Sequence, residues 1–365
     1  RPPPPHCFFF NQTTQYYMLR SLVGSDMCIR YIFPRYYFSH DNFRIEWWYY
    51  TGNLENEKGK RFGYQLTFFR VGLEGDKPIK NPSKWKIGHI YFSHMTVSDI
   101  RNQKFYFFER INRRGIKNAG AETDRFLIWN SDWSLSGKGE KHNLKAFEKE
   151  TGIELSLTPL KKRVFHGKDG ISVKGGGKNN ASHYFSFTRM QTEGSIFIKG
   201  EKFQVKGTSW MDREFSSNQL NRSLVGWDWF SLKLENQTEI MLYQLRQKNG
   251  KIDPHSSGTF VAADENYHHL TSKEFTITPK SSWTSENTGA TYPAAWEIDL
   301  PNADIHLELV PDFSDQELYH LRSISGSYWE GSVSIKGRVN GKPVTGKGYI
   351  ELVGYQKALK QELPD

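Results

Sequence analysis

Hydrophobic and polar residues alternate in short runs along most of the chain, and Gly, Asn, Asp and Lys separate the runs. The first clear pair of runs, at residues 33–54 and 61–70, is joined by a turn at residues 55–60 and predicts a β-hairpin. Similar runs continue to about residue 212, for example HIYFSHMTVSDI, HYFSFTRM and EKFQVKGTSWMD. Short strands at this regular spacing favour a β-barrel or a β-sandwich over alternating strands and helices.

A second series of runs begins at GWDWFSLKL and echoes the first series. Trp47 and Tyr49 stand at the same distance before a Leu-Glu-Asn turn as Trp227 and Trp229 do. Whether this echo records a duplication or a chance match stays open, but it places a domain boundary near residue 220. A length of 365 residues also favours two domains.

We therefore predict an all-β fold made of two antiparallel β-barrels in tandem. The expected organisation is an irregular segment at residues 1–33, a first domain at residues 34–220 and a second domain at residues 221–365. Helix is scarce, and only residues 314–321 are expected to form one or two helical turns. Closing each strand series into a barrel would remove exposed edges and leave room inside for one small apolar ligand.

Charge is divided unevenly along the chain. Residues 1–225 contain 36 Lys or Arg and 21 Asp or Glu, a net charge of +15, and the remainder contains 13 and 19, a net charge of −6. The basic residues are scattered singly, which is typical of a solvated surface. We therefore expect no nucleic-acid partner. A membrane surface is a candidate partner, and the sequence makes no prediction of the oligomeric state.

The sequence contains no pattern that would hold a metal ion or a cofactor. Its two cysteines, Cys7 and Cys28, precede the first strand, so neither a disulfide framework nor a Cys-based metal site is expected in the core. HExxH, CxxC and G-x-S-x-G motifs are absent, which argues against a metal site and an α/β-hydrolase. No apolar run of about 18 residues predicts a membrane span, and RPPPPHCFFF lacks the pattern of a signal peptide.

Residues 209–216, SWMDREFS, interrupt the strand alternation with consecutive charged and aromatic side chains. Two interpretations are open. The segment is a surface turn with a local pair of Asp212 and Arg213, or it places Asp212 at the mouth of a barrel. A carboxylic acid buried among Trp210, Phe215 and Trp227 would have a raised pKa and could act as a general acid near neutral pH.

Two other segments carry candidate site residues. Strand alternation puts His183 and Phe185 on one face and Tyr184 on the other. His183 could orient an acid, donate a proton or bind water, or it could be an ordinary histidine at a strand end. In EWWYY, at residues 46–50, aromatic rings occupy both faces, so one set is expected to pack inward and the other to face the second domain or solvent. Rings that line a cavity would suit a polyene or a developing cation.

Several of these blocks resemble the signature of the AttH and CrtC family, which includes the carotenoid 1,2-hydratases. The blocks are FPR, HDNFRIEWWYYTGNL, GYQLTFFR, GTSWMDREFSSNQL and GWDWFSLKL, and the similarity spans about residues 33–355. The resemblance implies a pair of lipocalin-like barrels that need no cofactor. It also implies a periplasmic or secreted protein.

In the carotenoid hydratases, an Asp in a Tyr-x-Asp motif is proposed to protonate a C=C bond, assisted by a His-x-Trp motif. The resemblance carries these catalytic roles to Asp212 and His183. Trp210 stands at the Tyr position and Phe185 at the Trp position, so a phenolic hydrogen bond to the acid is expected to be missing. The residues expected to bind the substrate are Trp210, Phe185, Trp227, Trp229, Trp47 and Tyr49.

Three functions remain as hypotheses. The first is a hydro-lyase that adds water, by acid catalysis, to a C=C bond of an apolar isoprenoid-like substrate, as in the carotenoid hydratases. The second is a non-catalytic lipocalin-like carrier, or an AttH-type export accessory, whose aromatic residues only hold a lipid. A secreted hydrolase is third, because no nucleophile and base can be identified. The expected partner is a small apolar ligand.

Overall fold

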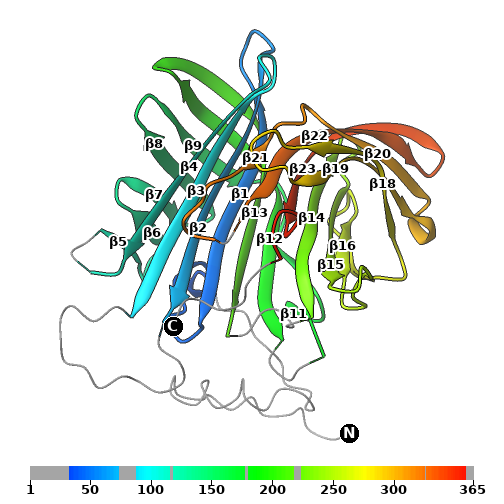
Figure 1. Cartoon of the computed structure of the whole chain (residues 1–365), viewed down its shortest axis with the longest axis horizontal. Helices are drawn as coiled ribbons and strands as arrows, with labels where there is room; N and C mark the ends of the chain where they lie inside the picture. Colours follow the sequence, from blue (N-terminus) through cyan, green and yellow to red (C-terminus); the bar gives the residue numbers. More distant parts are fainter. Residues whose placement is uncertain are drawn as a thin grey trace, which may run out of the picture.

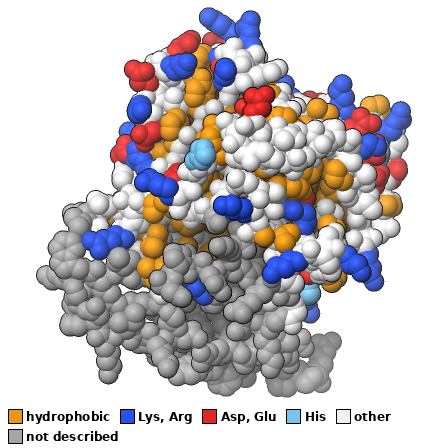
Figure 2. Space-filling view, in the orientation of Figure 1, with side chains coloured by type: hydrophobic (Ala, Val, Ile, Leu, Met, Phe, Trp, Pro, Cys, Tyr) orange, Lys and Arg blue, Asp and Glu red, His pale blue; other side chains and the backbone are white. Residues whose placement is uncertain are grey.

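The computed structural model describes residues 33–73, 88–115, 118–176, 180–217, 223–324 and 326–358. Within these ranges nearly all regular structure is β, and only η1 (Arg35–Tyr37) and η2 (Pro301–Ala303) form short 3-10 turns. Two curled antiparallel sheets lie side by side (Figure 1). The all-β prediction is therefore confirmed, and no helix in the described ranges is long and apolar enough to cross a membrane. Cys7, Cys28 and the predicted boundary near residue 220 lie outside the described residues (Figure 2).

The first sheet curls into a nearly closed barrel. Its hydrogen-bonded order is β4-β3-β2-β1-β13-β12-β9-β8-β7-β6-β5, with β10 and β11 paired to β12. The Asn130 side chain on β6 donates a hydrogen bond to the Arg110 carbonyl on β4 at 3.1 Å, and this contact joins the two ends of the sheet. The strands are β1 (Ile45–Glu55), β2 (Arg61–Gly72), β3 (His89–Asp99), β4 (Lys104–Arg113), β5 (Ala119–Ala121), β6 (Leu127–Asn130), β7 (Trp133–Lys138), β8 (Lys141–Glu148), β9 (Thr151–Pro159), β10 (Val164–Phe165), β11 (Ile171–Val173), β12 (Ala181–Ile198) and β13 (Glu201–Ser216).

The second sheet forms a half-barrel. Its order is β17-β16-β15-β14-β23-β22-β20-β19-β18, with β21 paired to β22, so β17 and β18 are the two edges. The strands are β14 (Leu224–Leu234), β15 (Glu239–Gln247), β16 (Ser257–Val261), β17 (Tyr267–Thr271), β18 (Thr276–Thr284), β19 (Thr291–Leu300), β20 (Ile305–Pro311), β21 (Glu317–Leu318), β22 (Tyr328–Val339) and β23 (Lys342–Val353).

The helix expected at residues 314–321 does not form. Glu317 and Leu318 instead pair with Trp329 and Tyr328 as strand β21. The buried Glu317 carboxylate accepts hydrogen bonds from several hydroxyl groups, including that of Tyr292 at 2.8 Å. These tertiary contacts outweigh the weak local helix preference of the segment.

Strand alternation divides the aromatic residues of β1 between two environments, as predicted. Trp48 and Tyr50 point into the barrel, where they join a packed core. Trp47 and Tyr49 point outward and join a second cluster with Trp229. Side chains of the core thus occupy the barrel interior, where the sequence predicted space for a ligand. The candidate site residues Trp47 and Tyr49 lie on the outside of the barrel instead.

The outer face of β1, β2, β3, β12 and β13 packs against β14, β15, β22 and β23 of the second sheet, and we call this contact the seam (Figure 1). Its two ends are joined by polar contacts. His94 Nδ1 lies 2.7 Å from the Tyr328 hydroxyl on one side. Lys161 pairs with Glu239 at 2.7 Å on the other. These groups are buried, so both contacts are shielded from water.

An ion cluster of Glu46, Arg70 and Arg213 lies inside the barrel, and all three side chains are fully buried. Arg70 donates to one oxygen of Glu46 and Arg213 to the other. The Ser39 hydroxyl adds a third hydrogen bond at 2.6 Å. Burial alone would raise the pKa of Glu46, but the charges of Arg213 and Arg70 outweigh it and hold that pKa well below its ordinary value. The cluster therefore joins three of the signature blocks through one carboxylate.

Replacing Glu46 with Gln is expected to lower the free energy of unfolding by ~3–5 kcal/mol, because two buried guanidinium groups lose their counter-charge. Urea unfolding followed by tryptophan fluorescence measures this change. In the native protein, the contribution of Glu46 should be complete above about pH 4.5 and should fall as pH drops through the depressed pKa. Glu308→Gln, at an exposed position of β20, is the control and should change stability by less than about 0.5 kcal/mol. Equal effects of the two substitutions would contradict this role.

Candidate functional site

Asp212 lies in the seam, in the middle of the long strand β13. Alternation along this strand turns Trp210, Asp212 and Glu214 toward the second sheet and Met211 and Arg213 into the barrel. Asp212 is only 3% exposed. Both the surface turn and the barrel mouth expected from the sequence are therefore wrong, because the segment continues as a strand and the acid lies on the outer wall of the barrel.

The Asp212 carboxyl group accepts three hydrogen bonds. The Tyr184 hydroxyl donates to Oδ2 at 2.6 Å, and Trp210 Nε1 donates to Oδ1 at 2.6 Å. The Ser186 hydroxyl also donates to Oδ1. Burial raises the pKa of Asp212 to about 7, although these three hydrogen bonds act to lower it. Near neutral pH the group is therefore partly protonated and held in a fixed orientation, as a general acid requires.

The register between β12 and β13 explains this set of donors. Ser186 pairs directly with Asp212, and Tyr184 pairs with Glu214, so all four side chains point into the seam. The Tyr184 hydroxyl in turn accepts a hydrogen bond from Trp229 Nε1 at 3.1 Å. The phenolic hydrogen bond expected to be missing is present, because Tyr184 supplies it in place of a residue at position 210.

His183 and Phe185 are not brought to Asp212. Each lies an odd number of residues from Ser186 along β12, so each points into the barrel. Phe185 is buried in the barrel core, with its ring 5.3 Å from that of Phe33. The ring of His183 stacks on Phe215 at 4.8 Å, and burial lowers its pKa to about 4. The structure thus contradicts the placement of both residues beside the acid.

A different histidine, His166, lies behind the site. Its Nε2 atom is 2.6 Å from the Ser186 hydroxyl, and its Nδ1 atom is 2.8 Å from the Thr259 hydroxyl. Burial lowers the pKa of His166 to about 3, so the ring is neutral at physiological pH. A neutral imidazole can accept a hydrogen bond from one hydroxyl while donating a hydrogen bond to the other. His166 therefore fixes the hydroxyl that holds Asp212.

The four aromatic residues predicted from the two hairpins do gather around the acid. Tyr49 and Trp229 meet edge to face, with ring centres 5.1 Å apart, and Trp47 and Trp227 pack against the same cluster. Two of these aromatic residues also contact carboxyl groups of the second sheet. Tyr49 donates a hydrogen bond to Glu330 at 2.7 Å, and Trp227 donates one to Glu351 at 2.9 Å.

The ammonium group of Lys174 lies over three aromatic rings of this site. Its Nζ atom is 5.6 Å from the ring centre of Trp47, 5.2 Å from that of Tyr184 and 5.5 Å from that of Tyr243. It also forms an ion pair with Glu214. The rings therefore already stabilise a positive charge beside Asp212.

The sequence missed five residues that contact or adjoin the acid. Tyr184 and Ser186 could have been found by extending the alternation argument from Asp212 across the β12–β13 hairpin. His166, Glu330 and Glu351 carry no local signal, because they come from segments whose pairing only the folded chain defines. These missed residues are Tyr184, Ser186, His166, Glu330 and Glu351.

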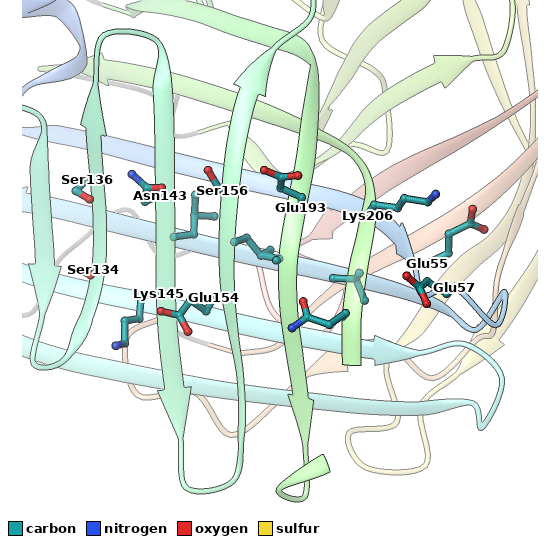
Figure 3. Close-up of a pocket in the computed structure, with 15 residues that line it drawn as sticks. Glu55, Glu57, Ser134, Ser136, Asn143, Lys145, Glu154, Ser156, Glu193 and Lys206 are labelled. Carbon is teal, nitrogen blue, oxygen red and sulfur yellow. The ribbon is translucent and has the colours of Figure 1, made fainter. Parts of the chain in front are cut away.

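An open groove of about 760 Å³ lies elsewhere, on the outer face of β7, β8, β9, β12 and β13 (Figure 3). Glu154, Glu193, Lys145 and Lys206 are among its lining residues, and no aromatic side chain of the described ranges lines it. Such a polar surface does not match the apolar ligand expected from the sequence. We therefore place the candidate site at Asp212 and not in this groove.

The fold and the site together define a lipocalin-like protein of two curled β-sheets, with a buried acid in the seam between them. The chain belongs to the AttH-like family, whose sequence profile matches residues 27–355. A solved AttH structure from Nitrosomonas europaea is 30% identical, with a TM-score of 0.80, and the match covers 89% of this chain and 97% of that one. Kievitone hydratase from Nectria haematococca shares the fold at 17% identity, with a TM-score of 0.67 over 85% and 89% of the two chains.

Two relatives carry the names of enzymes that add or remove water. Kievitone hydratase of Fusarium solani subsp. phaseoli is 25% identical over 167 residues, 45% of this chain and 46% of the relative. The dehydratase asqC of Emericella nidulans is 20% identical over 207 residues, 55% of this chain and 58% of the relative. The chain thus spans about half the length of these relatives. Hydratase-type activity occurs among its distant homologues.

Replacing Asp212 with Asn is expected to change how stability depends on pH. The folded protein binds the Asp212 proton more tightly than the unfolded chain, so ionisation of this group costs stability as pH rises from about 4 to about 7. The variant should therefore gain stability relative to the native protein across that interval and hold the gain above it. Urea unfolding at a series of pH values measures the difference, and a difference independent of pH would contradict the raised pKa.

Proposed function

We propose that this protein catalyses the acid-catalysed addition of water to a C=C bond of an apolar substrate, or the reverse elimination. One observation carries the proposal. Asp212 is a buried carboxyl group with a pKa of about 7, held by three hydrogen bonds within an aromatic cluster. A protonated acid in such surroundings is suited to donate a proton to a weakly basic alkene.

The chemistry follows from these contacts. Protonated Asp212 delivers its proton to the less substituted carbon of a trisubstituted alkene, and a tertiary carbocation forms on the other carbon. The faces of Trp47, Tyr49 and Trp229 stabilise the cation without bonding to it. Water then captures the cation, and the oxonium ion that results loses a proton to give a tertiary alcohol. Proton donation of this kind contributes about 10²- to 10⁴-fold to the rate, so orientation in the dry seam must supply the rest.

The named relatives support this reaction class, since one is a hydratase and the other a dehydratase. A carotenoid is one apolar alkene within the proposal, and a prenylated aromatic compound is another. Both contain the trisubstituted alkene that the mechanism requires.

A row of partly exposed aromatic rings supports an apolar substrate. The rings of Phe69 and Phe92 stack with centres 4.5 Å apart, and Phe69 lies 6.4 Å from Trp47, which packs against the site. Such a row offers a planar apolar molecule a continuous contact surface toward Asp212.

Asp212→Asn is expected to lower hydration of an alkene by about 10²- to 10⁴-fold, because Asn cannot donate the proton. Mass spectrometry after incubation with kievitone, 2-prenylphenol or neurosporene detects a product heavier by one water. In the native protein, kcat should fall as pH rises through about 7, since the ionised acid is inactive. Binding without any product, unaffected by the substitution, would overturn the proposal in favour of a carrier.

The matched control is Asp228→Asn. Asp228 is also a buried carboxyl with a raised pKa, and it lies between Trp227 and Trp229 on β14. Its side chain points away from the seam. Arg246 and Tyr355 each donate a hydrogen bond to it at 3.0 Å. Its replacement should leave hydration unchanged.

Phe69→Ala is expected to raise KM about two- to tenfold with little change in kcat, because an aromatic contact of ~0.5–1.5 kcal/mol is lost away from the acid. Steady-state kinetics with the best of the three alkenes provides the measurement. Phe147→Ala serves as the control, since Phe147 is partly exposed on β8 and packs on Phe197 instead. A fall in kcat alone would show that the row does not bind substrate.

A further inference from the structure

Two glutamates of the second sheet face Asp212 across the seam. Glu330 on β22 and Glu351 on β23 are direct partners in the strand pairing. Side chains at such positions have Cβ atoms about 4.5–5.5 Å apart. Glu330 is fully buried and Glu351 is partly buried, in surroundings where isolated carboxylates are costly. The structure of the core alone gives no reason to place two acids together there.

Hydrogen bonds and strand pairs connect this glutamate pair to Asp212 by two routes. Along the first route, Tyr184 donates a hydrogen bond to Asp212 and accepts one from Trp229. Trp229 of β14 is paired across the sheet with Glu351 of β23. Along the second route, Tyr49 of β1 is paired with Asp212 of β13, and its hydroxyl donates a hydrogen bond to Glu330. The two routes place the acid of the first sheet and the acids of the second on facing walls of one site.

The charges around Glu351 favour exchange of a proton. Burial raises the pKa of Glu351 to about 7; the hydrogen bond from Trp227 acts against this, and the negative charge of Asp212 adds to it. Glu214 on β13 and Lys174, which follows β11, also act on Glu351, with opposite signs. Two coupled carboxyl groups of similar pKa share protons, so near neutral pH one is an acid while the other is a base.

The glutamate pair also offers a place for water. Among the described residues no group donates a hydrogen bond to Glu330 Oε2, although this atom is buried. Burial, followed by the charge of Glu351, raises the pKa of Glu330 well above its ordinary value. A protonated Glu330 can donate to a water molecule or accept from it, and Glu351 lies on the neighbouring strand to remove its proton.

We propose that Glu351, supported by Glu330, is the second proton-transfer group of the site and removes a proton from the water that attacks the substrate. The inference rests on the proposed function. Asp212 gives its proton to the alkene, the π electrons form the new C–H bond, and the other carbon is left as a carbocation. Water forms the C–O bond, and its extra proton passes to the Glu351 carboxylate. Solvent then returns the protons to their starting positions.

In the elimination direction the same two groups exchange roles. Glu351 protonates the leaving hydroxyl group, and Asp212 removes the proton from carbon. A single arrangement of two carboxyl groups therefore serves both a hydratase and a dehydratase.

The test separates the two proton transfers with 2-prenylphenol in D₂O. Glu351→Gln is expected to lower hydration by about 10²- to 10⁴-fold while the vinylic hydrogen still exchanges for deuterium, because Asp212 continues to protonate the alkene reversibly. Asp212→Asn should abolish both. Hydration by Glu351→Gln at the native rate would overturn the inference.

Glu351→Asp keeps a carboxyl group and should hydrate at a rate between those of the native protein and Glu351→Gln. Asp228→Asn is again the control and should preserve both hydration and exchange. If Glu351→Asp were as inactive as Glu351→Gln while it exchanged deuterium normally and unfolded at the native temperature, the carboxyl group would not be the base.

A measurement without turnover keeps this inference distinct from the proposed function. Infrared bands of protonated carboxyl groups report the titration of Glu351, identified by its loss in Glu351→Gln. Asp212→Asn removes a nearby negative charge and should shift this titration to lower pH. An unchanged titration would overturn the shared site. A native protein that hydrates none of the probes, yet shows the shift, would refute the reaction while the coupled carboxyl pair stands.

Discussion

The pairing of Glu46 with Arg70 and Arg213 inside the barrel fixes which face of β1, β2 and β13 points outward. Side chains alternate along a strand, so a slip of one residue would expose these charges to the seam and bury Asp212 in the barrel. A buried ion pair of this kind stabilises one register far more strongly than the registers on either side. The acid site thus depends on a charge cluster that never touches it.

The same alternation explains how much of the molecule could be predicted from the sequence. Period-two patterns were sufficient for the all-β fold and for the division of Trp47 and Tyr49 from Trp48. The family resemblance failed for His183, because a matching distance along the chain does not say which face a residue occupies. The register of β12 against β13 decides that, and it favours Tyr184 and Ser186.

The remainder of the site lay beyond such patterns for a physical reason. Glu330 and Glu351 reach the seam from strands more than a hundred residues after Asp212, and only packing between two sheets joins them. The second sheet is a half-barrel, so its convex face is free to cover the first barrel. An interface between two sheets can bring buried acids together without placing either group inside a core.

Lys174 gives the seam a property of its own. Its ammonium group rests on the rings of Trp47, Tyr184 and Tyr243, next to the carboxylate of Glu214. The seam is therefore organised around a positive charge, with ring faces and a counter-ion in position. In the proposed reaction a carbocation would use ring faces that now hold this ammonium group, and because like charges repel, Lys174 would have to move aside for it.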